Sequence, residues 1–307
     1  MPSMKALKRR RTTVKSIQQI TKAMNLVATS KLQRAKANLA SVREPVLATF
    51  NIAYNTLNNE NVQEQLFVER RKVKTTAYIL ITGNRGLCGG YNSNACKELV
   101  KHARENGKDY IIVPIGTKGR DYFSRRRGNV AEFSATDMGS FETAQDAARL
   151  VMEKYKAGEI DEVFVVYTKF ISVLSLEPVI KPILPINVDF LRMALNVDVK
   201  AGESWENLGF FPMPEAKSTR GQQEVEYEPG IADVLQAVIP WYLGMFMYAA
   251  IASSVLCEQA ARMTSMDSAT NNAGEIIEKL TLMFNRLRQS IITQEITEIV
   301  SGANALQ

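Results

Sequence analysis

The sequence predicts an α/β fold in which N- and C-terminal helices form a long antiparallel coiled coil, with an α/β domain inserted between them. Helical periodicity dominates both ends of the chain, whereas β-rich runs alternate with helical segments in its middle. The 307 residues are 46% hydrophobic and 23% charged, which is typical of a folded globular chain.

The first helix is expected within residues 1–60. Pro45 is its one interior proline and would at most kink it. About 55 residues of helix would be ~80 Å long, so this helix is expected to pair with another. Its apolar stripe comprises Val14, Ile17, Ile20, Met24 and Val27 and, after a small phase slip, Leu32, Ala35, Leu39, Val42, Val46, Phe50, Ala53 and Leu57.

Charge is distributed unevenly along the chain. Eleven Lys and Arg precede Glu44, the first acidic residue, although the net charge is only +6. A cleavable transit peptide, a nucleic-acid arm and a helix facing an acidic partner all fit this composition. The apolar pattern continues past Phe50, and no aromatic residue precedes it. These features favour the partner-facing helix and argue against a nucleic-acid partner.

The second long helix is expected within residues 231–307, and it would reach ~110 Å if mostly helical. It is longer than its N-terminal partner, so its last turns are expected to project alone. Its apolar run Ala237–Cys257 contains Pro240 and Gly244, too many interruptions for a convincing membrane span. Its stripe comprises Leu235, Ile239, Leu243, Phe246, Ala250, Leu256, Ile276, Leu280, Phe284, Leu287, Ile291, Ile296, Ile299, Ala303 and Leu306.

Residues 73–190 are expected to form the α/β domain, and 191–230 a loop or insertion. Strand and helix alternate, which predicts a largely parallel sheet, and three prolines predict that Leu176–Pro185 is an edge strand. The other expected strands are Thr75–Thr82, Tyr110–Ile115, Glu162–Thr168 and a weaker Asn129–Phe133; the expected helices are Asn94–Glu105, Lys118–Arg127 and Phe141–Ala157.

Groups for catalysis are sparse, and neither a catalytic, a cofactor nor a metal site is predicted. His102 is the single histidine and is expected to be solvated. The glycine-rich run Gly83–Gly90 follows a strand, but it matches neither G-x-G-x-x-G nor a Walker loop, so a tight turn is favoured over nucleotide binding. Cys88 within it lacks a neighbouring histidine base, and three cysteines indicate a reducing compartment.

Four segments resemble the gamma subunit of rotary F-type ATP synthases: Ser16–Lys31, Arg85–Gly90, Glu258–Met263 and Ile292–Gly302. The resemblance spans nearly the whole chain in order. It implies a coiled-coil shaft with a Rossmann-like domain whose glycine loop binds no nucleotide. It also implies a non-catalytic rotor inside a ring of three alpha and three beta subunits, with its foot on the membrane ring of c subunits beside epsilon.

The same resemblance implies which residues contact partners. Arg262, Gln294 and Thr297 match positions that contact the surrounding ring, although periodicity alone makes the last two an ordinary polar face. Met24 matches a position near an acidic loop of beta, where Lys22 can engage carboxylates. The implied location is the cytoplasmic face of the cell membrane, without insertion into it. Whether protons or sodium ions are moved, and in which direction the complex works, stays open.

Two alternatives remain from the residues alone: a generic helical hairpin, and an α/β nucleotide-dependent enzyme with helical dimerisation arms.

The segment Asn196–Gly230 adds a separate question. Compared with the family it carries roughly 20 extra residues, expected at the surface. A dithiol switch is excluded there because no cysteine lies between Cys96 and Cys257. A latch formed by Trp205, Phe210 and Phe211, or a passive loop, remains.

Overall fold

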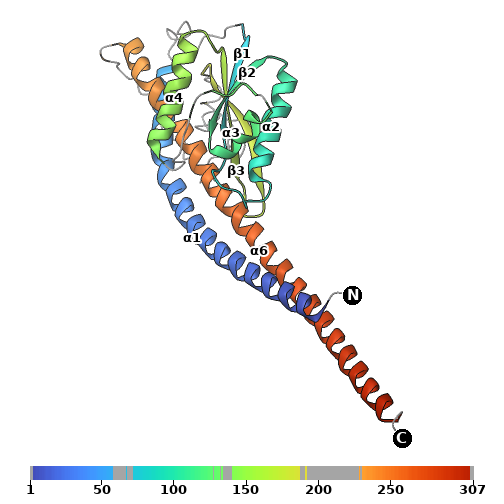
Figure 1. Cartoon of the computed structure of the whole chain (residues 1–307). Helices are drawn as coiled ribbons and strands as arrows, with labels where there is room; N and C mark the ends of the chain where they lie inside the picture. The colour runs from blue at the N-terminus through green and yellow to red at the C-terminus, as the bar shows by residue number, and fades with distance from the viewer. Residues whose placement is uncertain are drawn as a thin grey trace, which may run out of the picture. The chain divides into compact units, whose positions relative to one another are not determined.

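The computed structural model describes residues 3–57, 67, 72–126, 128–131, 133, 140–186, 191, 228 and 230–304 (Figure 1). The chain forms two compact units, Ser30–Ala261 and the pair Met1–Thr29 with Arg262–Gln307, and each long helix contributes to both. The elements are α1 (Met4–Leu57), β1 (Thr75–Ile81), α2 (Tyr91–Asn106), β2 (Asp109–Ile115), α3 (Thr117–Ser124), α4 (Phe141–Lys156), β3 (Glu162–Phe170), β4 (Leu176–Leu184) and α6 (Ile231–Asn304).

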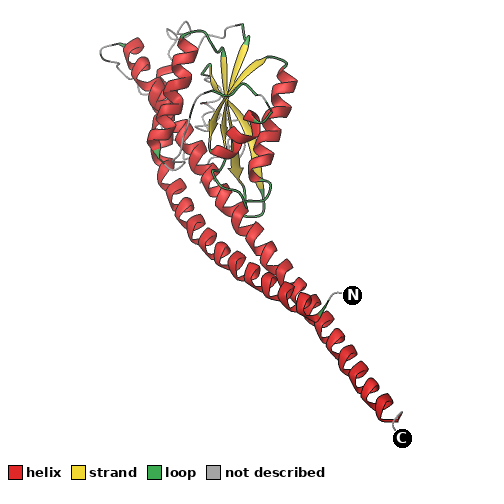
Figure 2. Cartoon of the chain, viewed as in Figure 1, coloured by secondary structure: helices red, strands yellow, loops and turns green. Residues whose placement is uncertain are grey.

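Unit Ser30–Ala261 contains a four-stranded sheet in the order β2-β1-β3-β4 (Figure 2). Strands β2, β1 and β3 are parallel, and β4 runs antiparallel to β3 at the edge. Pro178 and Pro182 lie in β4, where a missing N–H donor is tolerated because the outer side of an edge strand has no neighbour. The weak strand expected at Asn129–Phe133 is reduced to one bridge between Val130 and Ile112. The α/β fold class is confirmed.

Both faces of this sheet are covered, because alternate residues of β1 enter different cores. Ala77, Ile79 and Ile81 pack in a large core with side chains of α4, the second half of α1 and the first half of α6. Tyr78 and Leu80 pack on the opposite face against α2 and Phe123 of α3. The sheet is therefore a buried central layer, as its near-continuous apolar strands require.

The apolar stretch of α6 belongs to this core. By length and composition α6 contains one segment apolar enough to cross a membrane, and 61% of its most apolar window is buried in the protein. Leu243, Phe246 and Ala250 are at most 1% exposed. Burial against the sheet explains the apolar composition of this segment without a membrane.

The other unit pairs the first part of α1 with the last part of α6. Its inner face on α1 is formed by Leu7, Thr21 and Ala28, and on α6 by Met266, Ala273 and Leu280. The first part of the predicted stripe is not at the interface with α6: Ile17, Ile20, Met24 and Val27 are 39–58% exposed. By contrast, every residue of the stripe from Leu32 to Leu57 is buried in the other unit.

The end of α6 is exposed along its described length. Leu280 is its last buried residue, and every side chain from Ile292 to Ser301 is exposed. This agrees with the expectation that the C-terminal helix extends beyond the end of its partner helix. Of the segment 191–230, only residues 191, 228 and 230 are described, so Trp205, Phe210 and Phe211 lie outside the described residues.

Candidate functional site

The glycine-rich loop after β1 is closed by hydrogen bonds from within the chain. The Gly83 N–H donates to Asn92 Oδ1 at 2.8 Å, and the Thr117 N–H donates to Asn84 Oδ1 at 2.9 Å. The Gly119 N–H at the start of α3 donates to Thr82 Oγ1 at 2.8 Å. In nucleotide-binding folds such backbone N–H groups face the phosphates. Here these three are satisfied by side chains, which is the arrangement of a packed turn.

A carboxylate of α6 also lies at this loop. Glu258 is 8% exposed, and a Cβ added to Gly83 would lie 2.8 Å from its Cδ atom. A buried negative charge against the backbone of the loop would repel a phosphate group placed there. The position of the Glu258 carboxylate beside Gly83 supports the interpretation of Gly83–Gly90 as a tight turn rather than a nucleotide site.

Cys88 and His102 are both structural. Cys88 is 2% exposed, accepts a hydrogen bond from Asn92 Nδ2 at 3.2 Å and packs with Tyr91 and Cys257. His102 was expected to be solvated, and this was wrong: it is half-buried, with its Nδ1 atom 2.8 Å from the Tyr78 hydroxyl. The aromatic rings of Tyr78 and Phe164 beneath α2 provide a packing site that helical charge periodicity does not reveal.

Three predicted contact residues, Lys22, Met24 and Arg262, lie in the helical unit. Lys22 is exposed and lines a shallow groove between α1 and α6, and Met24 is 39% exposed. Arg262 is half-buried and precedes Met263, whose carbonyl oxygen accepts a hydrogen bond from Asn25 Nδ2 at 3.2 Å. These residues therefore lie in the same stretch of the helix pair.

Gln294 and Thr297 lie far along α6 from that stretch. Thirty-odd residues separate them from Arg262, or roughly 48 Å at 1.5 Å rise per residue. Both are exposed; Gln294 Nε2 donates to Glu298 Oε1 at 2.9 Å, and Thr297 Oγ1 donates to the Thr293 carbonyl at 2.8 Å. The predicted contact residues thus form two separate groups along one helix.

A larger surface feature is the outward apolar face of α1, whose residues periodicity identified without showing that they are exposed. We call Ile17, Ile20, Met24 and Val27 the outer stripe; their spacing of three and four residues places them on one side of the helix. All four are exposed, although burying such a side chain fully is worth about 1.5–3 kcal/mol. Contiguous exposed apolar surface of this kind marks a protein-binding face.

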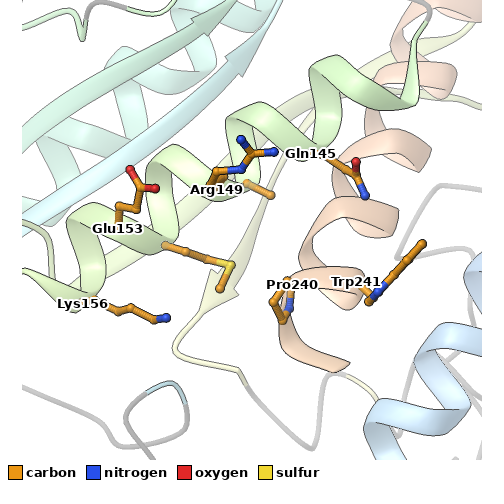
Figure 3. A pocket seen from close by; sticks show the side chains of 8 residues that line it. Gln145, Arg149, Glu153, Lys156, Pro240 and Trp241 are labelled. Carbon is orange, nitrogen blue, oxygen red and sulfur yellow. The ribbon is translucent and has the colours of Figure 1, made fainter. Parts of the chain in front are cut away.

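One hollow of the sheet-containing unit lies between α4 and α6 (Figure 3). Arg149, Glu153 and Lys156 line its α4 side, and Pro240 and Trp241 its α6 side. Trp241 is 57% exposed and stacks on Phe141 with ring centroids 6.1 Å apart. Mixed charges around an exposed indole suit a protein contact better than a small-molecule site. Among the described residues, no group of three or more His, Cys, Asp or Glu is placed to hold a metal ion.

The comparisons with known proteins agree on one family. The ATP synthase family model matches residues 3–306. The ATP synthase gamma chain of Desulforamulus reducens is 39% identical over 310 residues, covering 100% of both chains, and that of Ruminiclostridium cellulolyticum is 38% identical over 99% of both. The chain belongs to the ATP synthase gamma-chain family. A further relative, from Acetobacterium woodii, is 37% identical over 98% of this chain and 97% of its own, and is described as sodium ion specific.

Chains in solved structures of mitochondrial ATP synthases share this fold. The central stalk of the Tetrahymena thermophila mitochondrial ATP synthase matches with a TM-score of 0.59 at 24% identity, covering 81% of this chain and 99% of that one. A chain of the Euglena gracilis enzyme has a TM-score of 0.59 at 17% identity, covering 99% and 94%. Membership of the gamma-chain family confirms the predicted central shaft of an ATP synthase, and the nucleotide-dependent enzyme is not favoured.

Proposed function

We propose that this gamma-family chain is a non-catalytic rotor that turns inside a ring of three alpha and three beta subunits. Its foot stands on the membrane ring of c subunits beside epsilon, at the cytoplasmic face of the cell membrane, and it does not insert into the bilayer. The ring of c subunits moves protons or sodium ions. The chain couples that ion flow to ATP synthesis or hydrolysis at the beta subunits and regulates the ATPase activity.

The observation that carries this proposal is the outer stripe. In an ordinary two-helix coiled coil the apolar stripe faces the partner helix and the polar residues face water. Here Ile20 and Val27 are 58% and 56% exposed, while the hydroxyl-bearing Thr21 is buried at 9%. This outward-facing apolar surface supports a helix pair that is covered by other subunits, as a shaft within a ring is.

An asymmetric shaft surface would explain how the three beta subunits come to differ. Three chemically identical beta subunits adopt different conformations only if a central element contacts each one differently. The shaft changes the balance between open and closed sites only through its differential interaction with the two states. By linkage, nucleotide binding and release at each site act back on the orientation of the shaft.

Basic residues supply the charge that such contacts need. The first 43 residues contain no acid, and Lys22 lies in the groove with Lys15. We propose that Lys22 engages an acidic loop of beta beside Met24, and that Arg262, Gln294 and Thr297 contact the ring at two levels of α6. Exposed charges contribute modestly to affinity, but they guide and orient the contact.

Cross-linking within the purified complex tests these contacts. Met24, Gln294 and Thr297 are each replaced by cysteine in a background without native cysteines, and then carry a benzophenone maleimide. Adducts with alpha or beta are expected at all three positions. The control is a cysteine at Lys101, exposed on α2 of the sheet-containing unit, which is expected to give no such adduct. Shaft positions that label no ring subunit would refute the proposal.

A further inference from the structure

Polar side chains cross the interface of the helical unit. Gln18 Nε2 donates to the Thr270 carbonyl at 3.4 Å, and Asn25 Nδ2 donates to the Met263 carbonyl at 3.2 Å. Between them, the hydroxyl oxygens of Thr21 and Thr270 lie 2.8 Å apart. We call these five residues the polar seam.

The spacing of the polar seam matches on both helices. Gln18 and Asn25 are one heptad apart on α1, and their partners Thr270 and Met263 are one heptad apart on α6 in the opposite direction. Backbone carbonyl oxygens recur at every helical turn, so both amide bonds could form again after a slip of one turn. The contact that only one antiparallel alignment satisfies is the hydroxyl pair of Thr21 and Thr270.

Neighbouring groups hold the seam side chains in place. The Thr21 hydroxyl lies 3.0 Å from the Gln18 carbonyl, and Thr29 Oγ1 lies 3.4 Å from Asn25 Oδ1. Gly274 leaves room for Gln18, because a Cβ at residue 274 would lie 3.3 Å from Gln18 Nε2. Shape and hydrogen bonding thus select the same alignment.

A slip of one helical turn would break this match. It moves α6 by about 5.4 Å along α1, which separates Thr21 from Thr270 and brings Thr270 or Glu278 to the place of Gly274 beside Gln18. Purely apolar interfaces repeat from turn to turn, so they distinguish neighbouring registers poorly. A buried polar position in a coiled coil specifies register at some cost in stability.

We propose that Gln18, Thr21 and Asn25, together with Thr270 and Gly274, are positioning residues that fix α1 and α6 in one axial register. The outer stripe lies on the same stretch of α1, so the register determines which exposed side chains of the two helices stand at the same level. A rotor that carries torque needs this pattern to stay constant under load. Only this consequence for coupling rests on the proposed function.

A distance measurement in the purified ATP synthase complex tests the register. Spin labels are placed at Ala23→Cys and Gln289→Cys, both exposed, after replacement of the three native cysteines, all of which are buried. The labels lie roughly 35 Å apart along the helix axis in the observed alignment. Electron–electron double resonance is expected to give one narrow distance for the parent complex.

Two variants remove the seam. The first variant, Thr21→Val with Thr270→Val, replaces both hydroxyls. The second, Gln18→Leu with Asn25→Leu, replaces both amides and is used if the first variant does not assemble. We expect a second distance about 5 Å from the first, since one turn is the smallest slip that keeps the helical faces aligned. It should appear in roughly a tenth of the complexes or more, and the ions pumped per ATP should fall.

Matched controls separate register from mere packing. Thr21→Ser with Thr270→Ser retains the hydroxyl pair and is expected to restore the single distance and normal pumping. Thr281→Val removes a hydroxyl that bonds only within α6, to the Ile277 carbonyl at 2.8 Å, and is expected to change neither. A single parental distance in both seam variants would overturn the proposal, even if cross-linking had established the ring contacts.

Discussion

Gly116 joins β2 to α3 in a backbone conformation that residues with a side chain rarely adopt. Its φ is +99°, and an added Cβ would overlap the carbonyl oxygen of Thr82 at the end of β1. Gly86 offers a control, because a Cβ there would meet nothing within 4 Å. The two glycines come from similar glycine-rich turns, yet only one is required by the packing.

Gly116→Ala is therefore expected to destabilise the protein by roughly 1–3 kcal/mol or more, since the strain and the overlap with rigid backbone add. Gly86→Ala is expected to stay within about 0.5 kcal/mol of the parent. Thermal unfolding of the isolated chain or of the complex measures both. Equal melting temperatures for the two variants would contradict the strain at Gly116.

The thiol of Cys96, in α2, is shielded from solvent, with 1% of the residue exposed. Burial raises the pKa of its thiol to about 12, with Arg126 lowering it in part. The thiolate is the reactive form, so iodoacetamide at pH 8 is expected to label Cys96 only after unfolding. Because the folded pKa is raised, the thiol's contribution to stability is complete below about pH 8.5 and declines as the pH rises toward the folded value. Rapid labelling of the folded protein would contradict this.

Met24→Lys adds a cation to the outer stripe. If this position faces acidic groups of beta, the new charge is expected to over-stabilise one rotary dwell, slow ATP turnover and steepen its temperature dependence. A gain of about 1.4 kcal/mol in the dwell would slow turnover tenfold, less so at high salt. Met24→Leu is the matched control and should turn over normally. An unchanged activation enthalpy in the lysine variant would argue against the contact.

At the scale of whole elements, the exposed end of α6 needs a bearing supplied by other subunits. Ile299 is 71% exposed and Val300 is 53% exposed. Deleting residues 299–307 removes Ile299 and Val300, which are not buried within this chain, so the truncated chain should fold and still support ATP hydrolysis. Assembly or pumping under load is expected to weaken. A truncated chain that assembles and couples normally at high load would rule out a bearing at this end.

The elements themselves were largely predictable from sequence because their signals are local. Strand β1 is a continuous apolar run, and the stripe from Leu32 to Leu57 has helical spacing, so both are placed as expected. The exposure of the outer stripe was not predictable, because periodicity identifies an apolar face but not what covers it. The polar seam was missed because Gln18 and Asn25 acquire their role only when α6 lies opposite.

In the whole molecule, the sheet-containing unit resembles a nucleotide-binding domain. The place where such a domain would bind the phosphates, beside Gly83, is filled by side chains of the protein itself. Glu258 occupies the space beside Gly83, and Ser253 Oγ donates to the Thr168 carbonyl of β3 at 3.0 Å. The helix that makes these contacts continues into the helical unit. Fold class alone would therefore have suggested a nucleotide enzyme, and only the chemistry of particular residues argues against it.

As the shaft, this chain should rotate relative to the subunits that hydrolyse ATP. The direct measurement fixes the alpha–beta ring to a surface, attaches a bead to this chain through Asn94→Cys on the exposed side of α2, and follows single complexes after ATP is added. We predict rotation in one direction with three pauses in each turn, one for each beta subunit. A bead that stays fixed relative to the ring while ATP is hydrolysed at the full rate would contradict the role of this chain as the shaft.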